Sequence, residues 1–303
     1  MKQKILHSLT IEDLTRLHRS LNSDKTNPHI HLVDMPYRFT SIWEEDGCPF
    51  SIWEEGDDIA GWAVFQTAWW NLDLHIPPKI QNSQLEREMI EWGVAQMRAY
   101  SNRSGDSFWG SVEIFASDPH ASRFREILFS LGFKQFEWST IRFARELSAA
   151  SLPSAPKLPD GYTIRPLAGQ AEVAGYVAAH RGAFNSEVMT EKWRSRTLQH
   201  PHYRPELDLV VSDSDNRVAG FCVCWLIDGV GQIEPLGLHP DFQGLGLGKA
   251  LETAAIRTLF EHGAHTLLVD HVSLNEKAIG LSLRNGFKQV DDALRFYVEI
   301  APA

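Results

Sequence analysis

Two short segments of this chain occur twice, once in each half. The sequence DIAGWAV around Gly61 parallels RVAGFCV around Gly220, and LGFKQ around Gly132 parallels NGFKQ around Gly286, so the spacings are 159 and 154 residues. A repeat of this length predicts one fold that is copied twice. The chain of 303 residues is also about twice as long as a typical domain of roughly 150 residues. We therefore expect two domains.

The boundary between the two copies is predicted at residues 148–159. This segment reads SAASLPSAPKLP, and its three prolines and small residues stop both a helix and a strand from continuing. We interpret it as a linker between a first domain at 1–147 and a second domain at 160–303.

Apolar spacing in the second half predicts strands that alternate with helices. The expected strands are 162–167, 207–212, 218–226, 232–238 and 266–269, and the expected helices are 173–184 and a second one that begins at Leu247 and stops at Gly263. A turn at 213–216, which reads DSDN, joins two of these strands.

A glycine-rich segment, QGLGLGK at 243–249, lies between the strand 232–238 and the following helix. Because Gly244, Gly246 and Gly248 lack a Cβ atom, the backbone is able to turn sharply and to present several N–H groups on one concave face. A helix N-terminus at the same point adds unpaired N–H groups and the positive end of the helix dipole. Such a turn is suited to binding a pyrophosphate.

Spacing separates three kinds of phosphate-binding loop. A dinucleotide fingerprint that starts at Gly244 would need a small residue in place of Lys249. A P-loop would need glycine in place of Gln243 and serine or threonine in place of Ala250. The pattern that fits is Q/R-x-x-G-x-G/A, in which Gln243 takes the first position.

A second motif follows at 275–287, which reads NEKAIGLSLRNGF. With the glycine loop it resembles the GNAT superfamily of N-acetyltransferases, whose later motif is N-x-x-A-x-x-L-Y-x-x-x-G-F. The residues that match are Asn275, Ala278, Leu281, Gly286 and Phe287, and Ser282 stands where the family has tyrosine. The resemblance covers roughly residues 160 to 300, and the first half matches faintly.

The resemblance implies an α/β (α+β) fold of two tandem GNAT-like domains, each a mixed, mostly antiparallel twisted sheet that helices flank. It implies acetyl-CoA as the acyl donor, held by the loop and by the backbone of the preceding strand, which parts from its neighbour; Pro235 lacks the N–H that would continue the ladder there. The backbone N–H of Leu238 would polarise the thioester carbonyl. The implied donor-binding residues are Leu236, Gly237, Leu238, Gln243, Gly244, Leu245, Gly246, Leu247, Gly248, Lys249 and Asn275.

Glu234 is the candidate general base, because it lies on the strand that delivers the donor and on the same face as Gln232. Its carboxylate would take the ammonium proton of an amine through water. The alternatives are an exposed strand residue or an anchor for substrate charge. His239, beside the phosphates, and His271, near the cleft, are reserve candidates.

Ser282 is the candidate acid at the position of the family tyrosine, although its hydroxyl is shorter and much less acidic. Three alternatives stay open at this point. Ser282 acts through water, Tyr297 donates the proton instead, or no dedicated acid exists. The last is chemically acceptable because a thiol has a pKa of about 8 to 9.

The first half lacks the glycines that the loop requires. Its aligned segment, 75–85, reads HIPPKIQNSQL, so we expect the first domain to keep the fold without a donor site. Trp69 and Trp70 are adjacent, so both cannot point inward from one strand. We expect one of them to line a substrate cleft or the interface between domains.

Charge and hydropathy limit the kinds of binding partner that we expect. With 39 acidic and 29 basic residues the net charge is −10, which disfavours broad binding to nucleic acid. No apolar run approaches the ~18 residues of a membrane span, and the first residues lack a signal-peptide core, so we expect a cytoplasmic protein without a membrane partner. The three cysteines, Cys48, Cys222 and Cys224, are expected to be free thiols.

These features predict an N-acetyltransferase that moves an acetyl group from acetyl-CoA to the amine of a small molecule, by direct attack in a ternary complex and without a metal. We expect a monomer or a homodimer. An acyl-CoA sensor without turnover is the alternative from another class, and transfer of a longer acyl group is a third hypothesis.

Overall fold

The computed structural model describes the chain except for residues 7–10, 23–31, 41–49, 78–79 and 81–82. The first half contains β1 (Lys2–Leu6), α1 (Ile11–Asn22), η1 (Leu32–Asp34), α2 (Met35–Thr40), β2 (Phe50–Glu55), β3 (Asp58–Gln66), β4 (Asn71–His75), α3 (Ser83–Ser104), β5 (Phe108–Phe115), α4 (Ala121–Ser130) and β6 (Lys134–Glu146). A 3-10 turn, η3 (Ala149–Ser151), opens the linker.

The second half repeats this order of elements. It contains β7 (Thr163–Pro166), η4 (Gly169–Glu172), α5 (Val173–Phe184), α6 (Glu191–Thr197), η5 (Pro205–Leu207), β8 (Asp208–Ser212), β9 (Val218–Ile227), β10 (Val230–Leu238), η6 (Pro240–Phe242), α7 (Leu247–Glu261), β11 (Thr266–Val272), α8 (Glu276–Arg284) and β12 (Lys288–Ile300). None of the helices in the described part of the chain has the length and hydropathy that a membrane span requires.

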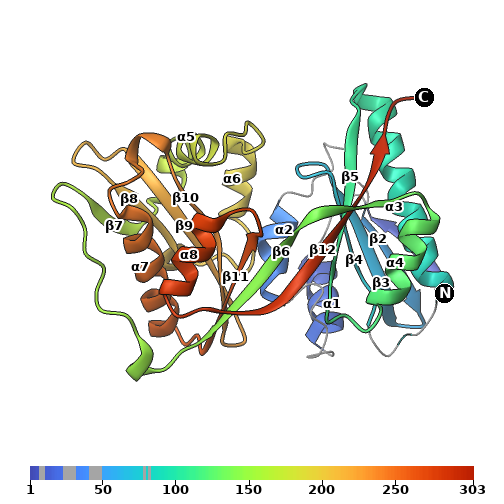
Figure 1. Cartoon of the computed structure of the whole chain (residues 1–303), viewed down its shortest axis with the longest axis horizontal. Coiled ribbons are helices and arrows are strands. Elements are labelled where there is room, and N and C mark those ends of the chain that lie inside the picture. The colour runs from blue at the N-terminus through green and yellow to red at the C-terminus, as the bar shows by residue number, and fades with distance from the viewer. Residues whose placement is uncertain (7–10, 23–31, 41–49, 78–79, 81–82) are drawn as a thin grey trace.

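The strands form one sheet of twelve in the order β1-β2-β3-β4-β5-β12-β6-β11-β10-β9-β8-β7. Among the described strands, β4 with β5 and β10 with β11 pair in parallel, and the other neighbours are antiparallel. From one edge of the sheet, β1 to β5 of the first half are followed by β12, the last strand of the second half. From the other edge, β7 to β11 of the second half are followed by β6, the last strand of the first half. The mixed, mostly antiparallel sheet that the sequence predicts for each half is thus part of one continuous sheet across the molecule (Figure 1).

The two halves exchange their last strands. β12 pairs with β5 from Ala293↔Phe115 to Ile300↔Phe108, and on its other side it pairs with β6. β6 in turn pairs through Thr140 to Glu146 with the whole length of β11 in the second half. Both strands therefore cross between the halves (Figure 1). The linker at 148–159 stays a predicted sequence boundary, and the hydrogen-bonded sheet extends across it.

Helices cover both faces of the sheet, and β9 shows how. Its alternate residues Phe221, Val223 and Trp225 pack in the cluster that contains α5, whereas Cys222 and Cys224 pack in the cluster beneath α7. The prediction that Cys222 and Cys224 are free and buried is confirmed. Cys48 lies outside the described residues. In the first half α3 and α4 cover one face, and α1 and α2 cover the other.

The exchanged strand carries core residues of the other half. Phe296 and Ile300 of β12 lie in the hydrophobic cluster of the first half, where Phe124 and Phe133 also pack. The side chain of Phe296 is fully buried. Hydrophobic burial therefore stabilises β12 in its place in the first half, in addition to the hydrogen bonds between strands.

Phe296→Ala should lower the free energy of unfolding by about 3–5 kcal/mol, because it leaves a cavity in the core of the first half. Urea denaturation measures this change. Val290→Ala, at the exposed start of the same strand, is the control and should stay within about 0.5 kcal/mol of the wild type. A loss of less than about 1 kcal/mol for Phe296→Ala would contradict the role assigned to the exchanged strand.

Candidate functional site

Strands β10 and β11 part near the middle of the sheet. They pair in parallel only from Val230↔Thr266 to Gln232↔Leu268. Beyond that point β10 follows β9 as far as Leu238, whereas β11 follows β6 as far as Val272. The ladder between β10 and β9 shifts register between Ile233 and Leu236, the stretch that holds Pro235. The strand before the loop thus leaves its neighbour where the sequence predicts it.

The glycine loop joins this free part of β10 to α7. Gly244 and Gly246 have φ angles of +81° and +80°, and Gly246 is the N-cap of α7. Among the described residues, no backbone acceptor pairs with the N–H groups of 244–249. Leu247 is fully buried and anchors the loop in the core beneath α7. This geometry fits an anion at the helix N-terminus.

The other predicted donor-binding residues lie around the same point. Gly237 has no room for a side chain, because a Cβ atom there would lie 2.6 Å from the Phe221 ring and 2.9 Å from Cβ of Ala183. The Gln243 amide nitrogen donates to the Leu238 carbonyl oxygen at 3.4 Å. The backbone of β10 from Leu236 onward thus stays close to the loop.

Three predicted residues have exposed side chains at the rim of this region. Leu245 is exposed at the tip of the loop, and Lys249 is exposed in the first turn of α7. Asn275 is the N-cap of α8, and its side-chain oxygen accepts from the Ala278 N–H at 3.2 Å. Their roles toward a donor stay predictions.

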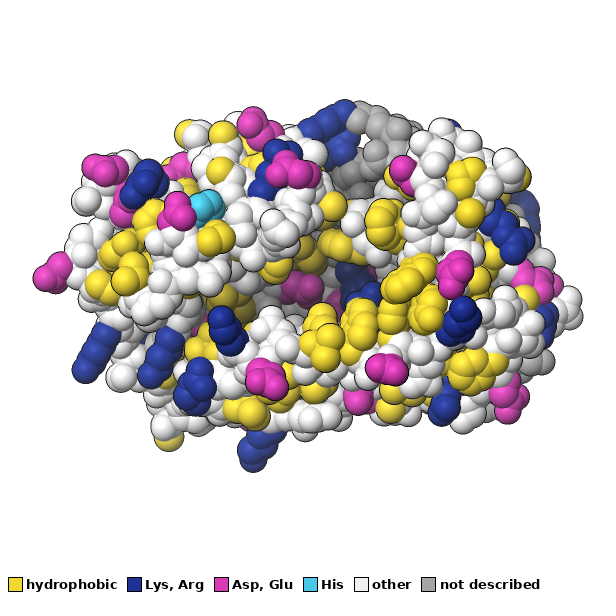
Figure 2. Space-filling model, turned by 45° about the horizontal axis from the view of Figure 1, so that its top comes forward, with side chains coloured by type: hydrophobic (Ala, Val, Ile, Leu, Met, Phe, Trp, Pro, Cys, Tyr) yellow, Lys and Arg dark blue, Asp and Glu magenta, His cyan; other side chains and the backbone are white. Residues whose placement is uncertain are grey.

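A cavity of about 430 Å³ lies between the two halves. Figure 2 shows a hollow between the halves with acidic and basic side chains inside it and hydrophobic ones around it. The first half contributes Tyr37, Arg38, Ala68, Trp69, Asn71 and Glu113 to the lining, and the second half contributes His180, Phe184, Ser186, Val188, Trp193, Glu234, Pro235, Val272 and Arg295.

Aromatic rings from both halves form one wall of this cavity. The ring centroid of Trp69 lies 5.7 Å from that of Tyr37 and 5.6 Å from that of Trp193. Trp70 is 43% exposed and stacks on Phe108 instead. One member of the tryptophan pair, Trp69, lines the cavity between the halves as expected. The pair lies in the turn between β3 and β4 and not on a strand, so the opposite directions come from the turn, where Trp70 has a φ angle of +49°.

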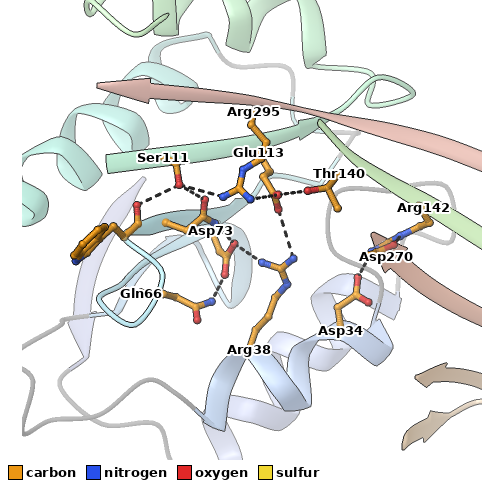
Figure 3. A network of polar contacts seen from close by, with 12 residues as sticks. Asp34, Arg38, Gln66, Asp73, Ser111, Glu113, Thr140, Arg142, Asp270 and Arg295 are labelled. Carbon is orange, nitrogen blue, oxygen red and sulfur yellow. Dashed lines mark hydrogen bonds and ion pairs between the residues drawn. The ribbon is translucent and has the colours of Figure 1, made fainter. Parts of the chain in front are cut away.

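A polar network contributes Arg38, Glu113 and Arg295 to the lining of the same cavity (Figure 3). Arg38 contacts Asp73 at 2.7 Å and Glu113 at 3.7 Å. Arg295 of the exchanged strand contacts Glu113 at 3.2 Å, and the Thr140 hydroxyl donates to Glu113 at 2.6 Å. Charges of both signs are thus held in place by partners from different strands.

A second ion cluster lies where β10 and β11 part. Arg142 of β6 contacts Asp270 of β11 and Asp34 of η1, each at 2.7 Å (Figure 3). Gln232, the last residue of β10 that pairs with β11, donates to Asp34. A segment of the first half therefore fixes the point where the strands of the second half separate.

The Glu234 carboxyl has a pKa that is raised to about 8. Burial is the main cause, since it removes the water that would solvate the charged form. Arg38 and Arg142 oppose the rise, and Asp270 and Asp34 add to it. The Trp225 indole N–H donates to the Glu234 carbonyl oxygen at 3.0 Å and holds the backbone here. Glu234 therefore changes protonation near the pH at which a general base is useful.

Ser282 has different surroundings from those of a catalytic acid. Its side chain is fully buried, and its hydroxyl donates to Glu252 at 2.9 Å and lies 2.8 Å from Nε2 of His271. Burial lowers the pKa of His271 to about 4, so that its ring is neutral near pH 7. Neither Ser282 nor His271 lines the cavity between the halves.

The other two candidates also have structural contacts. Tyr297 packs against Trp109 and Phe136, with ring centroids 5.0 and 4.4 Å away. Nδ1 of His239 accepts the Asp241 N–H at 3.3 Å at the start of η6, between β10 and the glycine loop. The structure thus leaves Glu234 as the one sequence-predicted titratable candidate that lines the cavity.

The sequence reasoning missed several residues of the cavity. His180 is buried, and neither of its ring nitrogens has a hydrogen-bond partner within the described part of the chain. Burial, with a smaller contribution from Arg194, lowers its pKa to about 4. Arg38, Glu113 and Arg295 come from separate elements and belong to no local motif.

The second half of the chain is similar in sequence to known acetyltransferases. Residues 170–287 match the family described as acetyltransferase (GNAT) family. A mycothiol acetyltransferase of Streptomyces avermitilis is 30% identical over 149 residues, which are 48% of each chain. One of Streptomyces coelicolor is 27% identical over 193 residues, which are 62% of each chain. The matched stretches span 48% and 62% of the length of these two curated relatives, which is less than two thirds of either protein.

Solved structures extend the similarity in fold to both halves. A GCN5-related N-acetyltransferase from Sphaerobacter thermophilus has a TM-score of 0.68 at 17% identity and covers 99% of this chain and 96% of its own. A tandem GNAT protein from the clavulanic acid biosynthesis pathway has a TM-score of 0.67 at 12% identity over the whole of both chains. The chain therefore has a tandem GNAT fold.

Arg38→Met should raise the pKa of Glu234 above about 8, because it removes a positive charge that stabilises the carboxylate. Titration of the side-chain carboxyl by ¹³C NMR measures this pKa. Arg16→Met, which breaks an ion pair with Glu54 elsewhere in the first half, is the control and should leave it unchanged. A wild-type pKa near the ordinary value of ~4.3 would contradict the described burial.

Proposed function

We propose that this chain, whose second half belongs to the acetyltransferase (GNAT) family, transfers an acetyl group from acetyl-CoA to the amine of a small-molecule acceptor. The observation that carries the proposal is the course of β10. One strand bears Glu234 beside the cavity between the halves, then the backbone of 236–238 beside the gap to β11, and then leads to the glycine loop.

The donor end of this arrangement fits acetyl-CoA. The N–H groups of 244–249 and the N-terminus of α7 suit the pyrophosphate. The backbone of Leu236, Gly237 and Leu238 would hold the pantetheine arm along the gap, and the side chain of Asn275 would meet it from the start of α8. Acetyl-CoA supplies the activated thioester, whose carbonyl the Leu238 N–H would polarise.

The acceptor is proposed to bind in the cavity between the halves. Five carboxyl groups and three guanidinium groups lie in or beside it. The negative charge is in excess, most of all once Glu234 has lost its proton near pH 8, and this favours an ammonium ion. The carboxyls are those of Asp34, Asp73, Glu113, Glu234 and Asp270, and the guanidiniums are those of Arg38, Arg142 and Arg295. The rings of Tyr37, Trp69 and Trp193 suit the apolar part of the acceptor.

Glu234 is the proposed general base. It takes one proton from the acceptor ammonium, directly or through water, and the neutral amine attacks the thioester carbonyl. The new N–C bond forms as the C–S bond breaks, and the electron pair of that bond leaves with the sulfur. The nitrogen releases its second proton to water as it becomes an amide. The proton on Glu234 then passes to solvent, so that the site returns to its starting state.

The departing thiolate needs no dedicated acid in this proposal. Ser282 is enclosed between Glu252 and His271, and Tyr297 packs among aromatic rings. A thiol with a pKa of about 8 to 9 is a good enough leaving group to depart as the thiolate.

The first half contributes part of the acceptor cavity in this proposal, and one donor site per chain is expected. Its segment 75–85 lies partly outside the described residues, so the missing glycines are a sequence argument. We propose a cytoplasmic enzyme for a small molecule, with no nucleic acid or membrane partner, active as a monomer or homodimer. We do not propose that this chain uses the acceptor of the mycothiol acetyltransferases, because the matched stretch spans about half of those proteins.

Gly246→Val should abolish binding of acetyl-CoA. The residue has a φ angle of +80° at the N-cap of α7, where a β-branched side chain distorts the loop. The thermal shift on adding acetyl-CoA measures binding, and at 100 times Kd the wild type should gain about 2.7 kcal/mol.

Gly105→Val is the matched control for this variant. Gly105 has the same φ of +80° and open space around it, but it lies between α3 and β5 in the first half. Gly105→Val should lose a similar amount of stability but keep the thermal shift on adding acetyl-CoA. An undiminished shift in Gly246→Val would remove the loop from the donor site.

Glu234→Gln should change the pH dependence of acetylation. In the wild type, kcat/KM should rise with pH and bend near 8, where the carboxyl loses its proton. Without the carboxylate, the bend should move up to the pKa of the acceptor amine. Glu261→Gln, at the exposed end of α7, should keep the wild-type profile. An unaltered bend in Glu234→Gln would exclude this residue as the base.

A further inference from the structure

A second groove, of about 460 Å³, opens beside the start of α7. Its walls are the linker residues 153–157, the face of α7 with Gly246, Lys249 and Thr253, and the end of α8 at Arg284. It shares no lining residue with the cavity between the halves. Because Gly246 belongs both to the groove and to the glycine loop, the groove continues directly from the proposed pyrophosphate position.

The charge of this groove differs from that of the chain. Three cationic side chains line it, those of Lys157, Lys249 and Arg284, and none of its described lining residues is acidic. The chain as a whole carries 39 acidic and 29 basic residues. Within the described residues, none of the three cations forms an ion pair. The groove is therefore an anion-binding surface on an acidic protein.

The charge of Arg284 acts on the carboxyl group of Glu252, which already has other hydrogen-bond partners. Glu252 is 3% exposed and accepts hydrogen bonds from Ser282 and Asn285. The Arg284 guanidinium lies beside Gly280, where a Cβ atom would come within 3.2 Å of its Nη1. Because its side chain is exposed at the groove, Arg284 is placed to bind an anion that enters from solvent.

The linker forms one wall of this groove and is held in place by contacts with the second half and with β6. The Arg257 guanidinium donates to the Pro153 carbonyl oxygen at 2.9 Å, and the Arg145 guanidinium donates to that of Ser151. Leu152 and Leu158 pack on the hydrophobic cluster beneath α7. These contacts hold the segment with Lys157 across from α7 and α8.

We propose that Lys157, Lys249 and Arg284 bind the ribose 3′-phosphate of coenzyme A, with the linker between the two halves as one wall of the nucleotide site. This inference rests on the proposed function. A coenzyme A molecule whose pyrophosphate lies on the N–H groups of the loop carries its nucleotide end toward a neighbouring surface. The 3′-phosphate is a doubly charged group with three acceptor oxygens, and charge-assisted hydrogen bonds to such groups are the strong ones.

The probes are coenzyme A and 3′-dephospho-coenzyme A, which differ only in this phosphate. Isothermal titration calorimetry at one fixed ionic strength gives both Kd values for the full chain. The wild type should bind coenzyme A about tenfold more tightly or better. Lys157→Gln and Arg284→Gln should each weaken the binding of coenzyme A and leave the affinity for 3′-dephospho-coenzyme A unchanged. The ratio of the two Kd values should therefore move toward one.

Lys288→Gln is the matched control, because it removes one exposed positive charge near the end of α8 that does not line the groove. It should keep the wild-type preference. Equal affinity of the wild type for the two probes would overturn the inference and leave the donor loop in place. The same change in the ratio of the two Kd values in Lys288→Gln would overturn the inference as well, since the net charge of the protein would then explain the change. Absence of binding for both probes would overturn the proposed function itself.

Discussion

The insertion of β12 between β5 and β6 is the interaction on which the rest of this molecule depends. It places Phe296 in the core of the first half and joins the two copies of the fold in one sheet. The same insertion brings Arg295 to Glu113 of β5. β6, displaced by one position, carries Arg142 to Asp270 of β11. The cavity between the halves is thus lined by side chains that meet only because the strands are exchanged.

The separation of β10 from β11 is the second constraint. A sheet that stayed paired beyond Gln232 would have no opening for a thioester. Arg142 and Asp34 occupy the point of separation, and their ion pair belongs to both halves of the chain. The ion cluster therefore joins the first half to the geometry of the proposed donor site, although the first half lacks the glycines for a donor loop of its own.

Local features of the site were predictable from the sequence because they depend on neighbours in the chain. The glycine spacing of 243–249 specifies a turn at a helix start, and the apolar period of 173–184 gives α5 its observed bounds. Ser282 shows the limit of a motif. Its position on α8 matches the family, but its contacts with Glu252 and His271 are set by how α7, α8 and β11 pack.

The acceptor cavity was not predictable in the same way. Arg38, Glu113 and Arg295 come from α2, β5 and β12, and no repeat or local period relates their positions. The exchange of strands leaves no mark in the apolar pattern, since β12 alternates like a strand in either place. Trp69 alone was expected there, and the strand alternation behind that expectation is wrong, because Trp69 and Trp70 lie in the turn between β3 and β4.

Release of thiol from acetyl-CoA in the presence of a panel of small amines tests the central claim most directly. The account predicts that the protein releases one thiol for each acetylated amine with at least one member of the panel, and that release without an amine is far slower. Tight binding of acetyl-CoA with no thiol release on any amine would contradict it, and would favour a protein that senses acyl-CoA without turnover.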